Sequence, residues 1–227
     1  MDSSIMIAGI RRHTEQLASD AADNLDAPIE HCPGWAVVDV VTHLGEVQGF
    51  WAGVVEHRST EQPSRDNSRS GVAPHEAVAW LRHQSSRLTS ALDTCADDVA
   101  LWTWWPPAQH AGFIKRRQLN ESAVHGWDVR NALGQPDPID EETSRIGLQE
   151  FVEVMAVDLQ PAKPRPPQVE LRVVDGLWRG LLFDPSATTS VSLLLEGSAS
   201  DLLLSVWGRR VIDDPAIAAA IDTIDLS

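Results

Sequence analysis

Lysine, cysteine and tyrosine are scarce in this chain of 227 residues, which contains two lysines, two cysteines and no tyrosine. Its 33 acidic and 18 basic side chains leave a net charge of −15, which argues against a phosphate backbone as a partner, because such binding needs clustered cations. We therefore expect no nucleic-acid partner. The cysteines, Cys32 and Cys95, are too few for a disulfide framework and do not form a C-x-x-C metal motif.

Long apolar runs are also lacking. No stretch approaches the roughly 18 apolar residues that a membrane-spanning helix needs. The first twenty residues do not contain the apolar core of a signal peptide. We expect a cytoplasmic protein without a membrane partner.

Apolar residues recur at helical spacing through most of the chain and predict five helices. A segment with four prolines, 161–168, separates this part from the rest and reads as a semi-rigid linker. The expected organisation is a helical bundle over 1–160, the linker, and a small α+β domain over 169–227. The predicted helices cover residues 4–24, 35–56, 74–96, 111–133 and 140–157.

The pattern changes after the linker. Residues 169–173 alternate apolar and polar side chains, an Asp-Gly turn follows, and 177–183 can return as a hairpin partner. A further strand is predicted at 190–196 and helices at 200–207 and 214–224. These elements favour an α+β fold class for the whole chain.

Tryptophan is abundant, with nine residues, and three of them fall within Leu101–Pro107 beside a proline pair. This composition is not that of a helix. Two explanations remain open: a loop that roofs a pocket, or an apolar plug that closes one end of the bundle.

Glu121 and His125 stand four residues apart, so that both side chains leave the same face of the predicted fourth helix. His43 interrupts the apolar stripe of the second helix and should point inward. The three residues are our candidate metal ligands. Each has a common alternative explanation, because most such Glu–His pairs lie on the surface and a core histidine is usually satisfied by a hydrogen bond.

Two imidazole nitrogens and one carboxylate oxygen suit zinc or another divalent ion, and three protein ligands leave one position open. That position can take water or an exogenous thiol. Asp128 or Glu46 is a candidate acceptor for a ligand imidazole N–H, although either is more commonly a surface acid. Cys32 is better explained as a small buried thiol than as a nucleophile.

Three motifs in order, Cys32–Trp35, Asp39–Gly45 and Glu121–Asp128, resemble the mycothiol-dependent maleylpyruvate isomerase family within the DinB-like metalloenzyme superfamily. The segment Gly197–Arg209 resembles the second domain of that family. The resemblance implies a DinB-like helical bundle followed by a small sterol-carrier-like α+β domain. It also implies zinc or another divalent ion at the three candidate ligands, and mycothiol as the thiol at the open position.

Arg209 matches a family arginine near the active site, and the resemblance implies a catalytic role in clamping a carboxylate; a solvated cation at a helix end is the alternative. The expected activity is isomerisation or S-transfer on a small electrophilic substrate, by a monomer or homodimer. A metal-dependent hydrolase and a non-catalytic module that binds a metal or small ligand are the alternatives.

Overall fold

The computed structural model describes residues 3–63, 71–156, 167–183 and 192–224. Backbone contacts divide the chain into two compact units, 1–137 and 138–227. This division comes earlier than the boundary that we expected at 160, because the fifth helix packs within the C-terminal unit. The proline-rich linker expected at 161–168 lies almost entirely outside the described residues.

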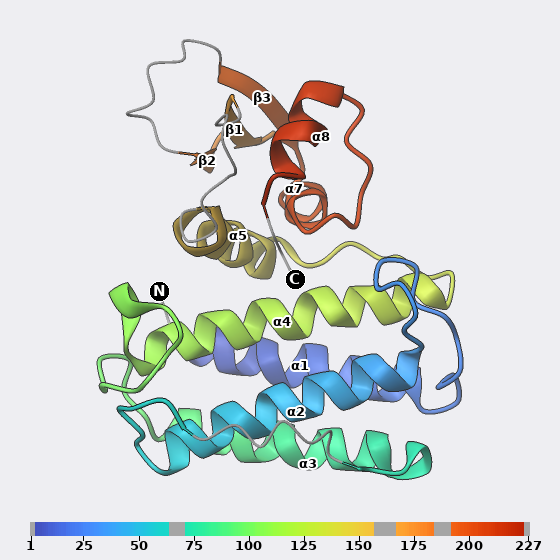
Figure 1. The fold of residues 1–227 in the computed structure, drawn as a ribbon, viewed down its shortest axis with the longest axis vertical. Helices are drawn as coiled ribbons and strands as arrows, with labels where there is room; N and C mark the ends of the chain where they lie inside the picture. The colour runs from blue at the N-terminus through green and yellow to red at the C-terminus, as the bar shows by residue number, and fades with distance from the viewer. Residues whose placement is uncertain (1–2, 64–70, 157–166, 184–191, 225–227) are drawn as a thin grey trace. The chain divides into compact units, whose positions relative to one another are not determined.

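The N-terminal unit consists mainly of four long helices, which confirm the first four predicted helices to within a few residues at each end. Helix α2 lies against α3, and α1 lies against α4 (Figure 1). The helices are α1 (Ser3–Ala21), α2 (Val37–Glu56), α3 (Pro74–Asp93) and α4 (Ala111–Ala132).

The ends of these helices follow the local chemistry of the sequence. Pro74 is the first residue of α3, where its missing N–H costs no hydrogen bond. Gly134 follows α4 with a φ of +73°, a left-handed conformation that glycine adopts without strain. Asp39 accepts a hydrogen bond from the Ala36 backbone N–H at 2.9 Å and thereby stabilises the first turn of α2.

One cluster of fully or almost fully buried apolar side chains holds α1, α2 and α3 together. The residues that α2 contributes are three or four positions apart and therefore share one side of the helix. The residues of this helix in the cluster are Val37, Val40, Val41 and Leu44.

The C-terminal unit contains α5 (Glu141–Glu150), a π-helix η2 (Phe151–Met155) and a three-stranded sheet with the order β2-β1-β3. The central strand β1 (Gln168–Val173) pairs antiparallel with β2 (Arg179–Leu182) and parallel with β3 (Ser192–Gly197). The predicted hairpin is therefore confirmed, whereas the sequence had not indicated the parallel partner.

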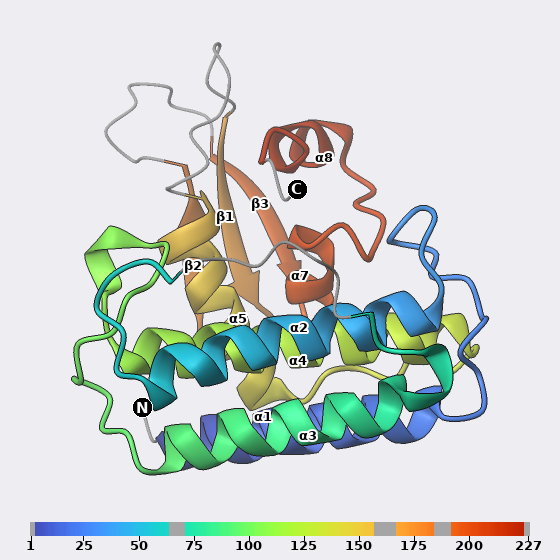
Figure 2. The same cartoon turned by 60° about the horizontal axis from the view of Figure 1, so that its bottom comes forward.

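Two helices, α7 (Ala199–Val206) and α8 (Pro215–Ile221), contact β1 and β3, as the second view allows the reader to follow (Figure 2). We expected the fifth helix to support the bundle, but α5 instead packs against α7. The helices and the mixed sheet together confirm the α+β fold class.

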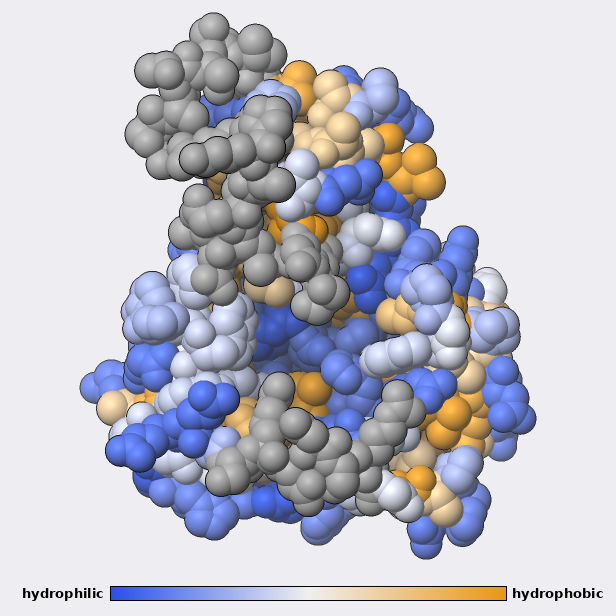
Figure 3. Space-filling view, viewed as in Figure 1, coloured by the Kyte–Doolittle hydropathy of each residue, from blue (hydrophilic) through white to orange (hydrophobic). Residues whose placement is uncertain are grey.

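The surface agrees with the acidic composition. Hydrophilic residues predominate over the visible face of the helical unit, and the apolar ones form small scattered patches (Figure 3). Among the described residues, no helix is both long enough and apolar enough to cross a bilayer.

Close packing of α2 against α3 makes a glycine necessary at position 45. A Cβ atom added to Gly45 would lie 2.2 Å from Cζ3 of Trp80, far inside van der Waals contact. We expect Gly45→Ala to lower the free energy of unfolding by about 1–3 kcal/mol, as overpacked sites usually do. Urea denaturation followed by circular dichroism measures the change.

Gly53→Ala is the matched control on the same helix, because a Cβ there meets nothing within 4 Å. This substitution should be neutral or stabilise the protein by up to about 1 kcal/mol, since alanine has the higher helix propensity. Equal destabilisation by both substitutions would contradict the packing argument.

Candidate metal centre

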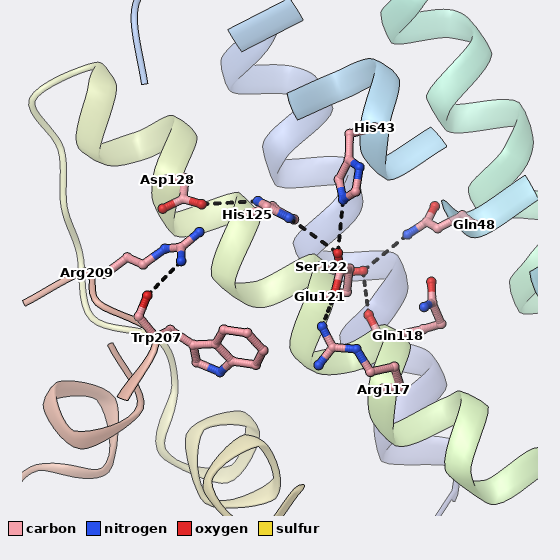
Figure 4. A network of polar contacts seen from close by, with 10 residues as sticks. All are labelled: His43, Gln48, Arg117, Gln118, Glu121, Ser122, His125, Asp128, Trp207 and Arg209. Carbon is pink, nitrogen blue, oxygen red and sulfur yellow. Dashed lines mark hydrogen bonds and ion pairs between the residues drawn. The ribbon is translucent and has the colours of Figure 1, made fainter. Parts of the chain in front are cut away.

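His43, Glu121 and His125 meet in the N-terminal unit. His43 comes from α2, while Glu121 and His125 lie one turn apart on α4. Figure 4 shows both imidazoles directed at the Glu121 carboxylate. The predicted inward orientation of His43 and the shared face of Glu121 and His125 are thus both present.

One carboxylate oxygen lies between the two rings. Oε1 of Glu121 is 3.2 Å from Nε2 of His43 and 3.4 Å from Nε2 of His125. The two ring centroids are 5.1 Å apart, and the planes are nearly perpendicular at 77°. Two nitrogens and one oxygen therefore converge on one small volume.

Arg117 engages the other oxygen of the same carboxylate. Its Nη2 forms an ion pair with Oε2 of Glu121, one turn earlier on α4, and each side chain is only 12% exposed. Burial alone would raise the pKa of Glu121. The positive charge of Arg117 and the hydrogen bonds from His125 and His43 outweigh this effect and hold that pKa well below its ordinary value.

Asp128 contacts the His125 ring at Nδ1, the nitrogen that does not face Glu121. Its Oδ2 lies 3.1 Å from Nδ1 of His125, and the carboxylate side chain is fully buried. Burial by itself would lower the pKa of His125, but the hydrogen bonds to Asp128 and Glu121 raise it to about 9. The metal-free protein consequently carries a protonated His125 at neutral pH.

Access to the centre comes from the His43 side. This imidazole is 33% exposed, against 12% for His125. It lines a cavity of about 330 Å³ that also includes Thr42, Glu46 and Trp35. The indole of Trp35 packs on the His43 ring with 5.2 Å between the ring centroids.

The three residues fit a divalent ion. Their donor atoms all lie within 4.8 Å of one another, and two imidazoles with one carboxylate form a donor set that zinc accepts. The Asp128–His125 contact is the kind of hydrogen bond that orients a metal-binding imidazole. His43, Glu121 and His125 would hold the ion.

Sequence reasoning treated Asp128 and Glu46 alike as candidate acceptors and more commonly surface acids. The structure separates them. Asp128 is buried against His125, whereas Glu46 lines the cavity beside His43. Asp128 follows His125 by three residues and therefore lies on the same helical face, so the spacing in the sequence indicated that the two side chains could meet.

The ion pair of Arg117 with Glu121 was not predicted from the sequence. A polar network behind the site was also missed. Gln48 donates to Thr14 at 2.9 Å and to Ser122 at 3.2 Å, linking α2, α1 and α4 immediately beside Glu121. Such contacts between helices depend on tertiary packing and leave no local signal in the sequence.

Three further residues considered in the sequence are not part of this cluster. Arg209 lies in the C-terminal unit, where its Nη1 donates to the Trp207 carbonyl at 2.7 Å, and its catalytic role stays a prediction. Neither cysteine forms a disulfide; Cys32 is partly exposed and Cys95 is buried. We expected Cys32 to be buried, but of the two cysteines only Cys95 is.

Comparison with known families decides the relationship. The family described as "Mycothiol maleylpyruvate isomerase N-terminal domain" matches residues 7–130, which is more than half of the chain. The chain belongs to this family. The matched residues contain His43, Glu121 and His125 and fall within the helical unit.

Two solved structures resemble the entire fold. A mycothiol-dependent maleylpyruvate isomerase is 16% identical, with a TM-score of 0.69 over 92% of this chain and 90% of the other. A histidine-to-alanine variant of a mycothiol-dependent maleylpyruvate isomerase is 15% identical, with a TM-score of 0.68 over 95% and 97% of the two chains. At this identity the likeness establishes the fold. No curated protein sequence matches the chain.

The pKa of His125 can be measured in metal-free protein. Nuclear magnetic resonance of labelled imidazoles should detect a histidine that keeps its proton up to about pH 9. Since this pKa lies above the ordinary 6.5, the stabilisation from protonated His125 is fully present below pH 6.5 and is lost as the pH rises through about 9.

Asp128→Asn should shift the pKa of His125 downward, because it removes the charge that favours the protonated ring. Asp137→Asn, an exposed position just beyond α4, is the control and should leave the titration unchanged. A wild-type His125 that titrated near its ordinary value would contradict the assignment of the cluster.

Proposed function

We propose that this protein is a metal-dependent enzyme that uses a low-molecular-weight thiol, in its family mycothiol, to isomerise or conjugate a small electrophilic substrate. The observation that carries this proposal is the convergence of two imidazole nitrogens and one carboxylate oxygen from α2 and α4 beside an accessible cavity. Membership of the isomerase family supports the choice of thiol. A divalent ion bound here, with zinc as the expected element, would lower the pKa of a coordinated thiol and so supply a nucleophile near neutral pH.

The protein's own residues prepare this chemistry. Arg117 pairs with one oxygen of Glu121 and leaves the other directed at both imidazoles. Asp128 fixes the orientation of the His125 ring through Nδ1, so that Nε2 faces Glu121. The ligand set is therefore oriented before any ion arrives, which lowers the entropic cost of binding.

His43 supplies the accessible side of the site. Its ring forms part of the wall of the cavity, and Trp35 covers one of its faces. A thiol and a substrate would reach the ligand set from this cavity. Asp128, next to His125, and Ser122, next to Glu121 in the chain, are both buried.

Binding of a metal ion at this site would release a proton from His125. His125 is protonated at neutral pH in the metal-free protein, and an imidazole must be neutral to act as a ligand. Occupation of the site therefore expels a proton that Glu121 and Asp128 had stabilised. These two carboxylates remain to balance the positive charge that replaces it.

Metal content tests the centre directly. Plasma mass spectrometry of untagged wild-type protein should find about one divalent ion per chain, with zinc the expected element. Glu121→Ala and His43→Ala should each lose most of it, because each removes one of three ligands.

His57→Ala provides a matched histidine control. His57 caps the same helix, with Nδ1 2.8 Å from the Gly53 carbonyl, and lies far along α2 from the cluster. Its substitution should leave the metal content unchanged. If wild-type protein supplied with zinc bound none, a non-catalytic binding module would become the better explanation.

Thiol binding tests the second half of the proposal. Calorimetric titration of zinc-loaded protein with mycothiol should give one site per chain, and Glu121→Ala should abolish it. Cys32→Ser should retain both binding and thiol-dependent turnover, because Cys32 contributes no donor atom to the cluster. Metal without thiol binding, together with hydrolysis of model esters, would favour a metal hydrolase.

A further inference from the structure

The tryptophan-rich segment builds a second cavity in the helical unit, distinct from the one beside His43. This cavity has a volume of about 470 Å³, within the range of small-molecule sites. Its aromatic walls are Phe50 and Trp51 from α2 and Trp102 and Trp104 from the loop. Of the two explanations offered for this segment, the lining of this cavity supports the pocket roof.

Three of the four aromatic walls pack against one another. Trp51 and Trp102 are stacked, with centroids 5.9 Å apart and planes inclined by 21°. Phe50 presents its ring edge-on to both, at 5.1 Å and 6.0 Å. Trp104 packs on Phe113 of α4 and is 37% exposed. Aromatic faces of this kind recognise planar apolar groups through offset stacking.

The loop that carries these walls is held rigidly. Its two ends pair through a β-bridge between Ala100 and His110. Inside it, the Gln109 side chain accepts from the Thr103 backbone N–H at 3.0 Å and donates to the Thr103 carbonyl at 2.6 Å. Trp102 donates its backbone N–H to Ser59 at 2.7 Å, which ties the loop to the end of α2.

These contacts also decide what the cavity can recognise. The polar atoms of Thr103 and Gln109 are used inside the loop, with the Thr103 hydroxyl bonded to the Trp105 and Ala108 carbonyls. Among the described lining residues none is charged. A chain with a net charge of −15 further disfavours an anionic ligand.

The two cavities lie along one face of α2. Glu46 lines the cavity beside His43, and Phe50, four residues later and hence on the same face, lines the aromatic one. His43 and Phe50 are seven residues apart, which is about two turns or roughly 10 Å along the helix axis. A ligand with one end at the metal centre could place its other end among the tryptophans.

We propose that the aromatic cavity is the subsite for a neutral planar aromatic group on the electrophilic substrate, whose reactive carbon lies toward His43. That the substrate is electrophilic rests on the proposed function. Binding of the aromatic group itself does not, because it depends on Phe50, Trp51, Trp102 and Trp104 alone. The substrate class is thus an aryl-substituted electrophile rather than a small dicarboxylate.

An unreactive probe tests the subsite without any catalysis. Calorimetry should detect binding of 4-phenyl-2-butanone to wild-type protein, and binding of 2-hexanone, an aliphatic ketone, should be much weaker. Trp102→Leu should weaken binding of the aryl ketone roughly tenfold, the loss expected when one aromatic face is removed.

Trp105→Leu is the matched control, since Trp105 stands in the same loop but does not line the cavity. It should bind the probe as wild type does. Phe50→Leu, on α2, provides a second variant in case Trp102→Leu fails to fold, which circular dichroism would reveal. It should weaken binding in the same direction.

Three results would overturn the subsite: no binding of the aryl ketone to wild type, equal losses in Trp105→Leu and Trp102→Leu, or displacement of the probe by maleate. Zinc content and mycothiol titration on the same preparations separate the two proposals. Probe binding without metal or thiol would leave the subsite standing and remove the proposed function. Metal and thiol binding without probe binding would leave the proposed function standing and remove the subsite.

Discussion

The candidate metal centre depends on one poorly exposed carboxylate. Glu121 is approached by Arg117 on one oxygen and by His43 and His125 on the other. A carboxylate this poorly exposed costs several kcal/mol to desolvate unless positive groups surround it. Because those groups come from both α2 and α4, the carboxylate also links these two helices at the centre.

The charge balance around this carboxylate explains why the site suits a cation. Glu121 and Asp128 supply two negative charges, and Arg117 supplies one fixed positive charge. In the metal-free protein the proton on His125 completes the balance, and its raised pKa of about 9 reflects that role. A divalent ion would replace the proton on Nε2 of His125, because it could bind this nitrogen and Glu121 while Asp128 keeps its hydrogen bond to Nδ1.

Helix α2 carries residues of both proposed sites, the metal centre and the aromatic cavity, at different points along its length. Its first half carries His43 and the cavity beside it, and its last turns carry Phe50 and Trp51. Rigid helices position side chains more accurately than loops do, so both subsites keep a constant spacing. The tryptophan loop gains comparable rigidity from hydrogen bonds between its own side chains and backbone.

Sequence periodicity alone determined the helices of the N-terminal unit, the hairpin of the C-terminal unit and the three candidate ligands. It succeeded because helical periodicity and the i, i+4 relation of Glu121 to His125 are local properties. The parallel pairing of β1 with β3 and the packing of α5 on α7 were decided by tertiary structure. So were the Arg117–Glu121 ion pair, the burial of Asp128 and the cavity beneath the tryptophans. Each depends on which surfaces meet when separate elements pack, and a linear pattern does not encode that choice.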